Sequence, residues 1–159
     1  MLRRLLTVAL LSGLAALPCA GRVTANSEKT SKVKVYLVAV DDKGKSGKKI
    51  GCDDSLVAVT RDVPKTQGVL KAALEELIAI PHEFNSQLGN YVVGPDLKVK
   101  SATIKGGTAT IRFSGAISVA GICDEPRITE QIIATAKQFR AVKRVKVFVG
   151  NQTLKDAIK

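Results

Sequence analysis

The amino-acid sequence predicts an α+β domain in which two helices pack on one mixed or antiparallel β-sheet, with the element order ββαββαβ. Three observations support this fold class. Runs rich in valine and isoleucine indicate strands, and two other segments repeat apolar residues at helical spacing. The Gly106–Gly107 pair between two of the strands is a hairpin signal. Helices that are separated by hairpins fit a sandwich with both helices on the sheet.

The first half of the domain contains two strands and a helix. Residues 33–40 are apolar on nearly both parities, which predicts a central strand covered on both faces. Residues 41–49 form a Gly- and Lys-rich loop, and residues 56–63 form the second strand. Thr66 is the expected N-cap of the helix, and Pro81 ends it. The core-facing stripe of this helix consists of Leu70, Ala73, Leu74, Leu77 and Ile78.

The second half begins with the largest loop, residues 82–96, which is polar and broken by glycine and proline. The hairpin follows, and a change of phase in its first strand predicts a bulge near Lys100–Ser101. Asp124–Pro126 opens the second helix, with acidic residues at its positive end and proline in the first turn. Residues 142–149 form the last strand. The apolar face of the second helix consists of Ile128, Ile132, Ile133, Ala136 and Phe139.

Residues 1–25 have the features of an export signal. A basic start, residues 1–4, precedes an apolar core at residues 5–17. This core is shorter than the ~20 apolar residues of a transmembrane helix, and no other stretch of the chain is long enough to span a bilayer. Small residues predict cleavage after Ala25, with a second candidate site after Ala20. We therefore expect a protein that is periplasmic, associated with the cell wall or secreted.

Cleavage would leave a short leader and a single domain. Residues 26–32 are polar and form the expected disordered leader, and residues 33–159 form the domain. The signal carries three arginines and no acidic residue, so its loss lowers the formal net charge from +11 to +8. Cys19 raises the alternative of a lipid anchor. Pro18 argues against that anchor, because the position before a lipidated cysteine is normally occupied by a small residue.

The mature chain keeps two of the three cysteines, Cys52 and Cys123. Two cysteines allow a single pairing, and export would place them in a compartment where disulfides persist. A structural disulfide is the interpretation that we favour. The alternatives are two free, buried cysteines that act as small apolar residues, and a reactive thiol.

Few residues suggest catalysis or cofactor binding, and we expect no cofactor. His82 is the only histidine and follows Pro81 in the long loop. The carboxylate pairs Asp41–Asp42 and Asp53–Asp54 could bind a cation, although such pairs at turns more often accept local hydrogen bonds. A cleft that brings His82, Ser86 and an acidic residue together would instead favour a hydrolase.

Basic residues gather in three places and predict a surface for an anionic partner, such as a wall polymer, lipid head groups or an acidic protein. The alternative is that these charges serve solubility. Nucleic acid does not fit, because the chain is exported and its basic clusters lack interleaved aromatic residues. The candidate residues are Lys43, Lys45, Lys48 and Lys49 in one loop, Lys98, Lys100 and Lys105 in the hairpin, and Arg140, Lys143, Arg144 and Lys146 around the last strand.

Several segments resemble the GerMN domain, a sporulation and spore-germination type module. They are the strand residues 35–38 and 56–64, the helix residues 70–77, the hairpin residues 104–111, the final helix residues 132–139 and the final strand residues 145–149. The similarity covers roughly residues 33–155. The Gly-Cys-Asp segment at Cys52 and the matching segment at Cys123 resemble an exported bacterial subgroup of the family. Residues 82–96 depart from it, because many relatives have a shorter loop there.

The resemblance implies a non-catalytic envelope module that binds or scaffolds a protein or an anionic wall component, linked to sporulation, germination or envelope processes. It supplies no ligand or active site that could be transferred to this chain. Two other hypotheses remain at this point: a secreted hydrolase that acts on the wall, and a secreted enzyme inhibitor. The sequence leaves the oligomeric state open.

Overall fold

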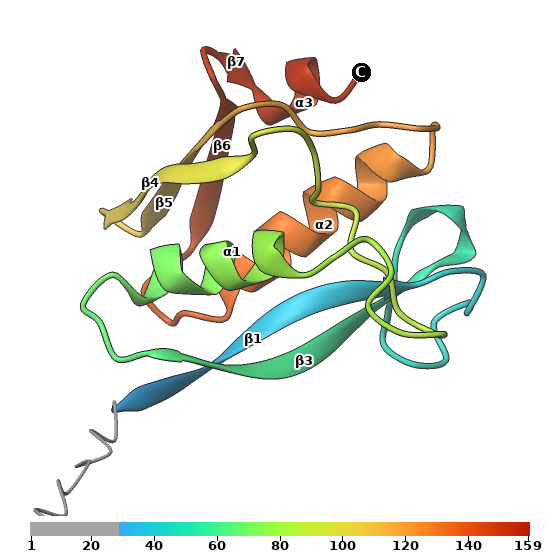
Figure 1. Cartoon of the computed structure of the whole chain (residues 1–159), viewed down its shortest axis with the longest axis horizontal. Helices are drawn as coiled ribbons and strands as arrows, with labels where there is room; N and C mark the ends of the chain where they lie inside the picture. The colour runs from blue at the N-terminus through green and yellow to red at the C-terminus, as the bar shows by residue number, and fades with distance from the viewer. Residues whose placement is uncertain (1–28) are drawn as a thin grey trace, which may run out of the picture.

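The computed structural model describes residues 29–159 (Figure 1). The expected export signal, its cleavage sites and Cys19 lie outside these residues. The elements in chain order are β1 (Thr30–Ala39), β2 (Lys48–Lys49), the 3₁₀ turn η1 (Gly51–Asp53), β3 (Ser55–Pro64), α1 (Val69–Ala79), β4 (Lys98–Lys105), β5 (Thr108–Ser114), α2 (Asp124–Lys137), β6 (Arg144–Val149), β7 (Gln152–Thr153) and α3 (Leu154–Ala157). The α+β class is confirmed, and the seven longest elements follow the predicted order ββαββαβ.

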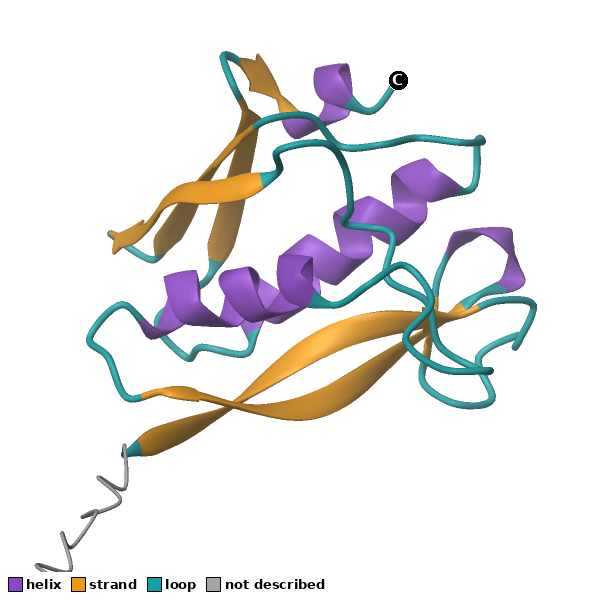
Figure 2. Ribbon diagram, viewed as in Figure 1, coloured by secondary structure: helices purple, strands orange, loops and turns teal. Residues whose placement is uncertain are grey.

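The strands form two sheets and not the single sheet that we expected. Sheet A has the order β1-β3-β2, and sheet B has the order β4-β5-β6-β7. Helices α1 and α2 lie between them (Figure 2). One apolar core joins the layers, with Leu37 from β1, Leu74 from α1, Ile111 from β5 and Ile132 from α2 all fully buried. The helices therefore cover the inner faces of both sheets. The outer face of sheet A is covered at one end, where Val38 and Leu56 pack against Ile50.

Strand β1 is not the central strand that its apolar sequence suggested. It pairs antiparallel with β3 on one side only. It also begins earlier than predicted, because the ladder reaches Thr30 opposite Pro64, and Lys32 forms an ion pair with Asp62 at 3.1 Å. Residues 30–32 of the expected disordered leader are therefore part of the strand.

The second edge of β1 is covered by side chains of α2. Gln138 accepts a hydrogen bond from Lys34 N at 2.7 Å and donates one to Lys34 O at 2.6 Å. Thr135 Oγ1 accepts from Tyr36 N at 3.3 Å, and Gln131 Nε2 donates to Tyr36 O at 2.7 Å. These contacts satisfy the main-chain groups that a neighbouring strand would otherwise bind.

Sheet B contains the predicted hairpin and bulge. Gly106 and Gly107 both have positive φ, 54° and 74°, which a two-residue type I′ turn requires. The register of β4 against β5 shifts between Val99 and Ser101, as the change of phase predicted. Strand β6 then pairs parallel to β5, because α2 carries the chain back along the sheet.

Helix α1 begins later than the sequence suggested. Gly68 occupies the N-cap position, and Thr66 Oγ1 accepts a hydrogen bond from Gly68 N at 3.1 Å, so Thr66 forms a turn before the helix. The predicted stripe is buried at Leu70, Ala73, Leu74 and Leu77, whereas Ile78 is half-buried. Helix α2 begins at Asp124, as predicted.

The long loop between α1 and β4 is attached to the helices by Asn90. Its Nδ2 donates to Leu77 O and Ile80 O at 2.9 and 2.8 Å. Its Oδ1 accepts from Val92 N at 3.0 Å and from Gln131 Nε2 at 3.1 Å. Asn90 and Gln131 are both fully buried, so these bonds form in a region of low dielectric constant where a lost partner is costly.

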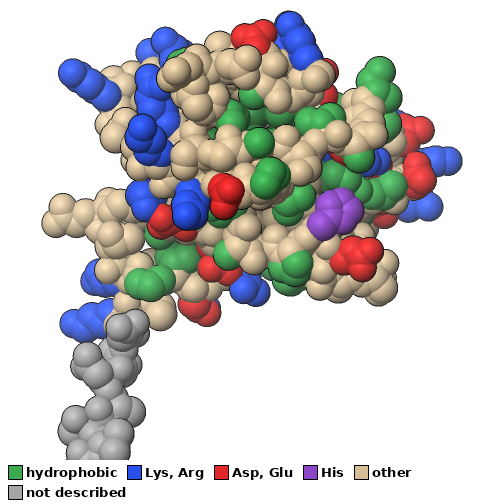
Figure 3. Space-filling model, turned by 45° about the horizontal axis from the view of Figure 1, so that its top comes forward, with side chains coloured by type: hydrophobic (Ala, Val, Ile, Leu, Met, Phe, Trp, Pro, Cys, Tyr) green, Lys and Arg blue, Asp and Glu red, His purple; other side chains and the backbone are tan. Residues whose placement is uncertain are grey.

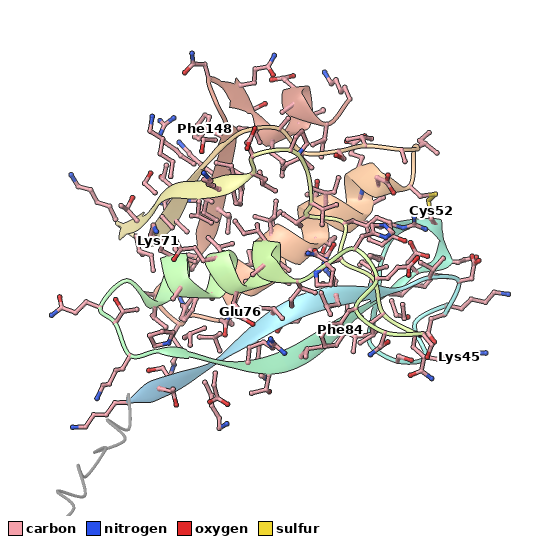
Figure 4. All side chains as sticks on the ribbon, viewed as in Figure 1. Lys45, Cys52, Lys71, Glu76, Phe84 and Phe148 are labelled. Carbon is pink, nitrogen blue, oxygen red and sulfur yellow. A yellow bond between two sulfur atoms is a disulfide. The ribbon has the colours of Figure 1, made fainter. Side chains whose placement is uncertain are left out.

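The expected disulfide is present and joins Cys52 in η1 to Cys123 before α2, with the Cα atoms 5.8 Å apart (Figure 4). A second contact connects the same two segments: Arg127 Nε donates to the fully buried Asp54 at 2.6 Å. Arg127 also lies over the ring of Tyr91, 4.6 Å from its centroid. The loop between β1 and β3 is thus attached to α2 by a covalent bond and by an ion pair.

Replacement of Gln131 by alanine should lower the free energy of unfolding by about 3 kcal/mol, because Tyr36 O, Tyr91 N and Asn90 Oδ1 would lose their shared partner inside the protein. Denaturant unfolding followed by circular dichroism measures this change. Gln152→Ala is the control, because Gln152 is exposed, and it should leave the midpoint almost unchanged. Equal midpoints for the two variants would contradict the role of Gln131.

Replacement of both Cys52 and Cys123 by serine should lower the free energy of unfolding by about 4 kcal/mol, because the disulfide closes a loop of 71 residues. The fold should persist, since Arg127 and Asp54 still connect the two segments. Chemical unfolding of the oxidised protein, the reduced protein and the variant measures the effect. A variant as stable as the oxidised protein would show that the bond carries no stability.

Candidate functional site

The outer face of sheet B carries the largest group of basic side chains on regular structure. Along β5, Ala109, Ile111 and Phe113 are buried against the helices. The alternating residues of β5 must point to the opposite face of the sheet, away from the core. Arg112 is one of these residues and is exposed.

The register of the neighbouring strands brings further basic residues to this face. Parallel pairing places Arg144, Lys146 and Phe148 of β6 beside Thr108, Thr110 and Arg112 of β5. On the other side, β4 places Lys105, Thr103, Ser101 and Lys98 beside the outward residues of β5. We call this group the basic sheet face: Lys98, Ser101, Thr103, Lys105, Thr108, Thr110, Arg112, Arg144, Lys146 and Phe148.

The basic sheet face contains five cations and no carboxylate. Arg112 lies over the ring of Phe148, 4.5 Å from its centroid, and Arg144 Nε donates to Thr108 Oγ1 at 3.2 Å. Within residues 29–159, none of the five cations forms a salt bridge. Figure 3 shows Lys and Arg side chains gathered over this part of the molecule. The face therefore has a positive potential that would attract an anionic ligand.

The structure brings together only part of the surface that the sequence suggested. The basic residues of the hairpin and the last strand meet on one sheet, and Lys143 N donates to Gly107 O at 2.7 Å, which places Lys143 beside the hairpin turn. Arg140 is exposed just after α2. Arg112 and Phe148 were missed, although Arg112 lies on the polar parity of a cleanly alternating strand.

The loop lysines are not part of this face. Lys43 and Lys45 lie in the loop after β1, and Lys48 and Lys49 form the short strand β2. Figure 4 shows Lys45 at the opposite end of the molecule from Phe148. Lys48 Nζ is 2.8 Å from Glu130, and Lys49 Nζ is 2.7 Å from Asp53. Two of the four charges are thus balanced by carboxylates.

A separate cleft of about 530 Å³ lies between the end of β1 and the long loop. It brings together His82, Ser86 and the carboxyl groups of Asp42 and Glu83, next to Val40, Val57, Leu88 and Tyr91. The ring of His82 meets the ring of Tyr91 edge-on at 4.9 Å. The residue types that would favour a hydrolase therefore do share one cleft.

The contacts within this cleft are not those of a nucleophile and its base. In the described part of the chain, no hydrogen bond joins His82 to Ser86 or to a carboxylate. Asp42 accepts hydrogen bonds from Ser55 Oγ and from Ser46, and these bonds hold the pKa of Asp42 below its usual value. Asp42 is therefore an ionised acceptor that keeps the loop folded.

The carboxylate pairs that we considered as cation ligands are used in other ways. Asp54 is bound to Arg127 and accepts from Asp41 N at 3.0 Å, and Asp53 is bound to Lys49, which lowers the pKa of Asp53. Across residues 29–159, no three His, Cys, Asp or Glu side chains meet as a metal site would require. None of the helices in this range is long and apolar enough to cross a membrane.

Comparison with known proteins identifies the family. The model of the Germane family, described as sporulation and spore germination, matches residues 34–155. The fold resembles the first GerMN domain of the sporulation protein GerM from Bacillus subtilis, with 25% identity, a TM-score of 0.59, and coverage of 79% of this chain and 87% of that one. The tandem GerMN domains of the same protein match with 24% identity and a TM-score of 0.57 over 80% of this chain.

This chain spans only 42% of the tandem structure, which is less than half of its length. No curated protein matches the chain. The family match covers nearly all of the described residues, and the α+β fold is consistent with the solved GerMN domain that it resembles. The chain belongs to the Germane family of sporulation and spore germination domains.

Proposed function

We propose that this protein is an exported, non-catalytic module that binds an anionic component of the cell envelope through the basic sheet face. One observation carries the proposal: five cations project from a single open face without a carboxylate among them. An exposed sheet face of this kind can lie against an extended anionic polymer or a charged lipid surface. Membership of the Germane family agrees with a role in sporulation or germination.

The chemistry of the face fits phosphate groups. Lysine and arginine supply charge, and the hydroxyls of Ser101, Thr103 and Thr110 lie between them as additional donors. The Arg112 guanidinium is held over Phe148, which orders it before a ligand arrives. Phosphate occurs both in wall polymers and in lipid head groups, so both are ligands to test.

The cleft beside His82 supports a wall-acting hydrolase as a second candidate, because it gathers a histidine, a serine and carboxylates. Two facts weigh against this candidate. Ser86 lacks a hydrogen bond to a base in the described residues, and Asp42 is already bound by Ser46 and Ser55 and therefore does not orient His82. We therefore favour a binding function over a hydrolase function.

Replacement of Arg112 and Lys146 by glutamine should weaken binding to anionic envelope material by about tenfold or more, because each cation near an anionic surface contributes about 1 kcal/mol. Cosedimentation with vesicles of anionic phospholipid and with purified anionic wall polymer measures the loss and shows which of the two sources binds. The double variant Lys43→Gln and Lys45→Gln removes the same charge from the other end of the molecule and should bind almost as well as the wild type.

Salt provides an independent test of the same face. Binding should fall steeply between low salt and about 0.5 M, where the screening length is only about 4 Å. Binding that is unchanged over this range, or equally weakened in both double variants, would argue against the basic sheet face. Absence of binding to either material would overturn the proposed function.

Export should leave a mature chain that begins at Asn26, because the residues before it satisfy the small-x-small rule of signal cleavage. Expression of the full-length chain, followed by N-terminal sequencing of the protein outside the cytoplasm, tests this. Ala25→Arg should block cleavage at this site and cause the precursor to accumulate. A full-length chain that starts at Met1 in the soluble cytoplasmic fraction would show that export is wrong.

A further inference from the structure

The outer edge strands of the two sheets differ in how they are protected from pairing with another strand. The edge of β1 is closed by Gln131, Thr135 and Gln138, and beyond them Val38 exchanges main-chain hydrogen bonds of 2.9 and 2.8 Å with Gly89. The edge strand β4 is interrupted by a bulge and carries Lys98, Lys100 and Lys105. A covered edge, a bulge and lysine side chains all protect an edge strand against pairing with another strand.

Within residues 29–159, the outer edge of β3 has neither a bulge nor side chains bound along its main chain between Val57 and Val63. Strand β2 covers it only at Ser55 and Leu56. Because the main chain of Lys34 points away from β3 toward Gln138, its partner Thr60 must direct its own N–H and C=O to the opposite edge. The same alternation directs the main chains of Ala58 and Asp62 outward. In the described chain, no hydrogen bond reaches these groups.

We propose that two copies of this chain pair antiparallel through residues 57–63 of β3, with the twofold axis at Thr60. The free edge is bounded by Leu56, which is bound to β2, and by Pro64, which has no N–H to donate. The midpoint of this stretch is Thr60, which would lie opposite its own copy. Such a pair would form about six main-chain hydrogen bonds, two at each of three outward positions.

The charges of β3 suit this register. With Thr60 on the axis, Arg61 lies opposite Val59 of the second copy, and Asp62 lies opposite Ala58. A shift that centres the pair on Arg61 would place two guanidinium groups opposite each other, each already paired with Glu76 of its own chain, and would use Pro64, which has no N–H, as a partner. The register centred on Thr60 places no like charges directly opposite each other and leaves Pro64 outside the ladder, so the strand can pair with a second copy of itself.

The symmetry of the pair has a consequence that rests on the proposed function. Two antiparallel strands in one sheet are related by an axis that runs perpendicular to the sheet. The helices and sheet B therefore lie on the same side of the joined sheet A in both copies. Within each copy, sheet B is separated from sheet A by the helices (Figure 2). Both basic sheet faces would point in the same direction, so a flat anionic surface could engage both at once.

Cysteine cross-linking tests the register without any envelope ligand. Thr60→Cys in a full-length background with Cys19→Ser adds one free thiol, since Cys52 and Cys123 are bonded to each other. Residues opposite each other in such a hydrogen-bonded pair have Cα atoms about 5.5 Å apart, within the range of a disulfide. Mild oxidation should link Thr60→Cys chains about tenfold faster than chains with Thr103→Cys, an exposed threonine on β4.

A charge exchange at the same position provides the second measurement. Thr60→Lys and Thr60→Glu should each be monomeric in sedimentation equilibrium, because like charges would face each other on the axis. An equimolar mixture should dimerise, because lysine then faces glutamate. Equal cross-linking of the two cysteine variants, a wild type that is monomeric at all concentrations, or a mixture that stays monomeric would overturn the dimer. None of these results depends on whether the basic sheet face binds an anion.

Discussion

The contact between α2 and the open edge of β1 is the constraint on which the rest of the fold depends. Gln131, Thr135 and Gln138 lie along one side of the helix and meet the outward main-chain groups of Lys34 and Tyr36. A helix that makes these bonds must run along the strand, because Gln131 to Gln138 rises about 10 Å and Lys34 to Tyr36 about 7 Å, a difference that the long glutamine side chains can span. Gln131 and Thr135 are fully buried, so a different orientation would leave polar groups without partners in the core.

The position of α2 decides where the basic residues lie. Helix α2 connects β5 to β6, and its placement under sheet B allows β6 to pair parallel to β5. That register puts Lys146 beside Thr110 and Phe148 beside Arg112. The inner residues of the same strands complete the core between the sheets. Each strand therefore has an apolar face and a basic face because of its pleat: the helices bury the apolar face, and the basic face stays exposed.

The far end of the molecule is organised by polar contacts and by the disulfide. Asp54, Arg127 and the Cys52–Cys123 bond attach the loop after β1 to α2, and Asn90 attaches the long loop to both helices. The cleft around His82 lies between these two attached loops. Its carboxylate Asp42 has a lowered pKa because it accepts hydrogen bonds that hold its own loop, and this explains why residue types suited to catalysis meet there without a catalytic contact.

The sequence by itself determined the seven long elements of this protein and their order. Periodicity located both long helices, Gly106–Gly107 located the hairpin, and the phase change located the bulge, because each of these signals is local. The two cysteines outside the expected export signal predicted the disulfide, because two cysteines allow one pairing. Tertiary structure alone decided the rest. A run such as Val33–Val40 does not reveal whether a strand or a helix covers its edge, and Arg112 joins Lys146 only through a register between strands that are distant in sequence. Pairing of distant segments depends on how the whole core packs, and no local pattern records it.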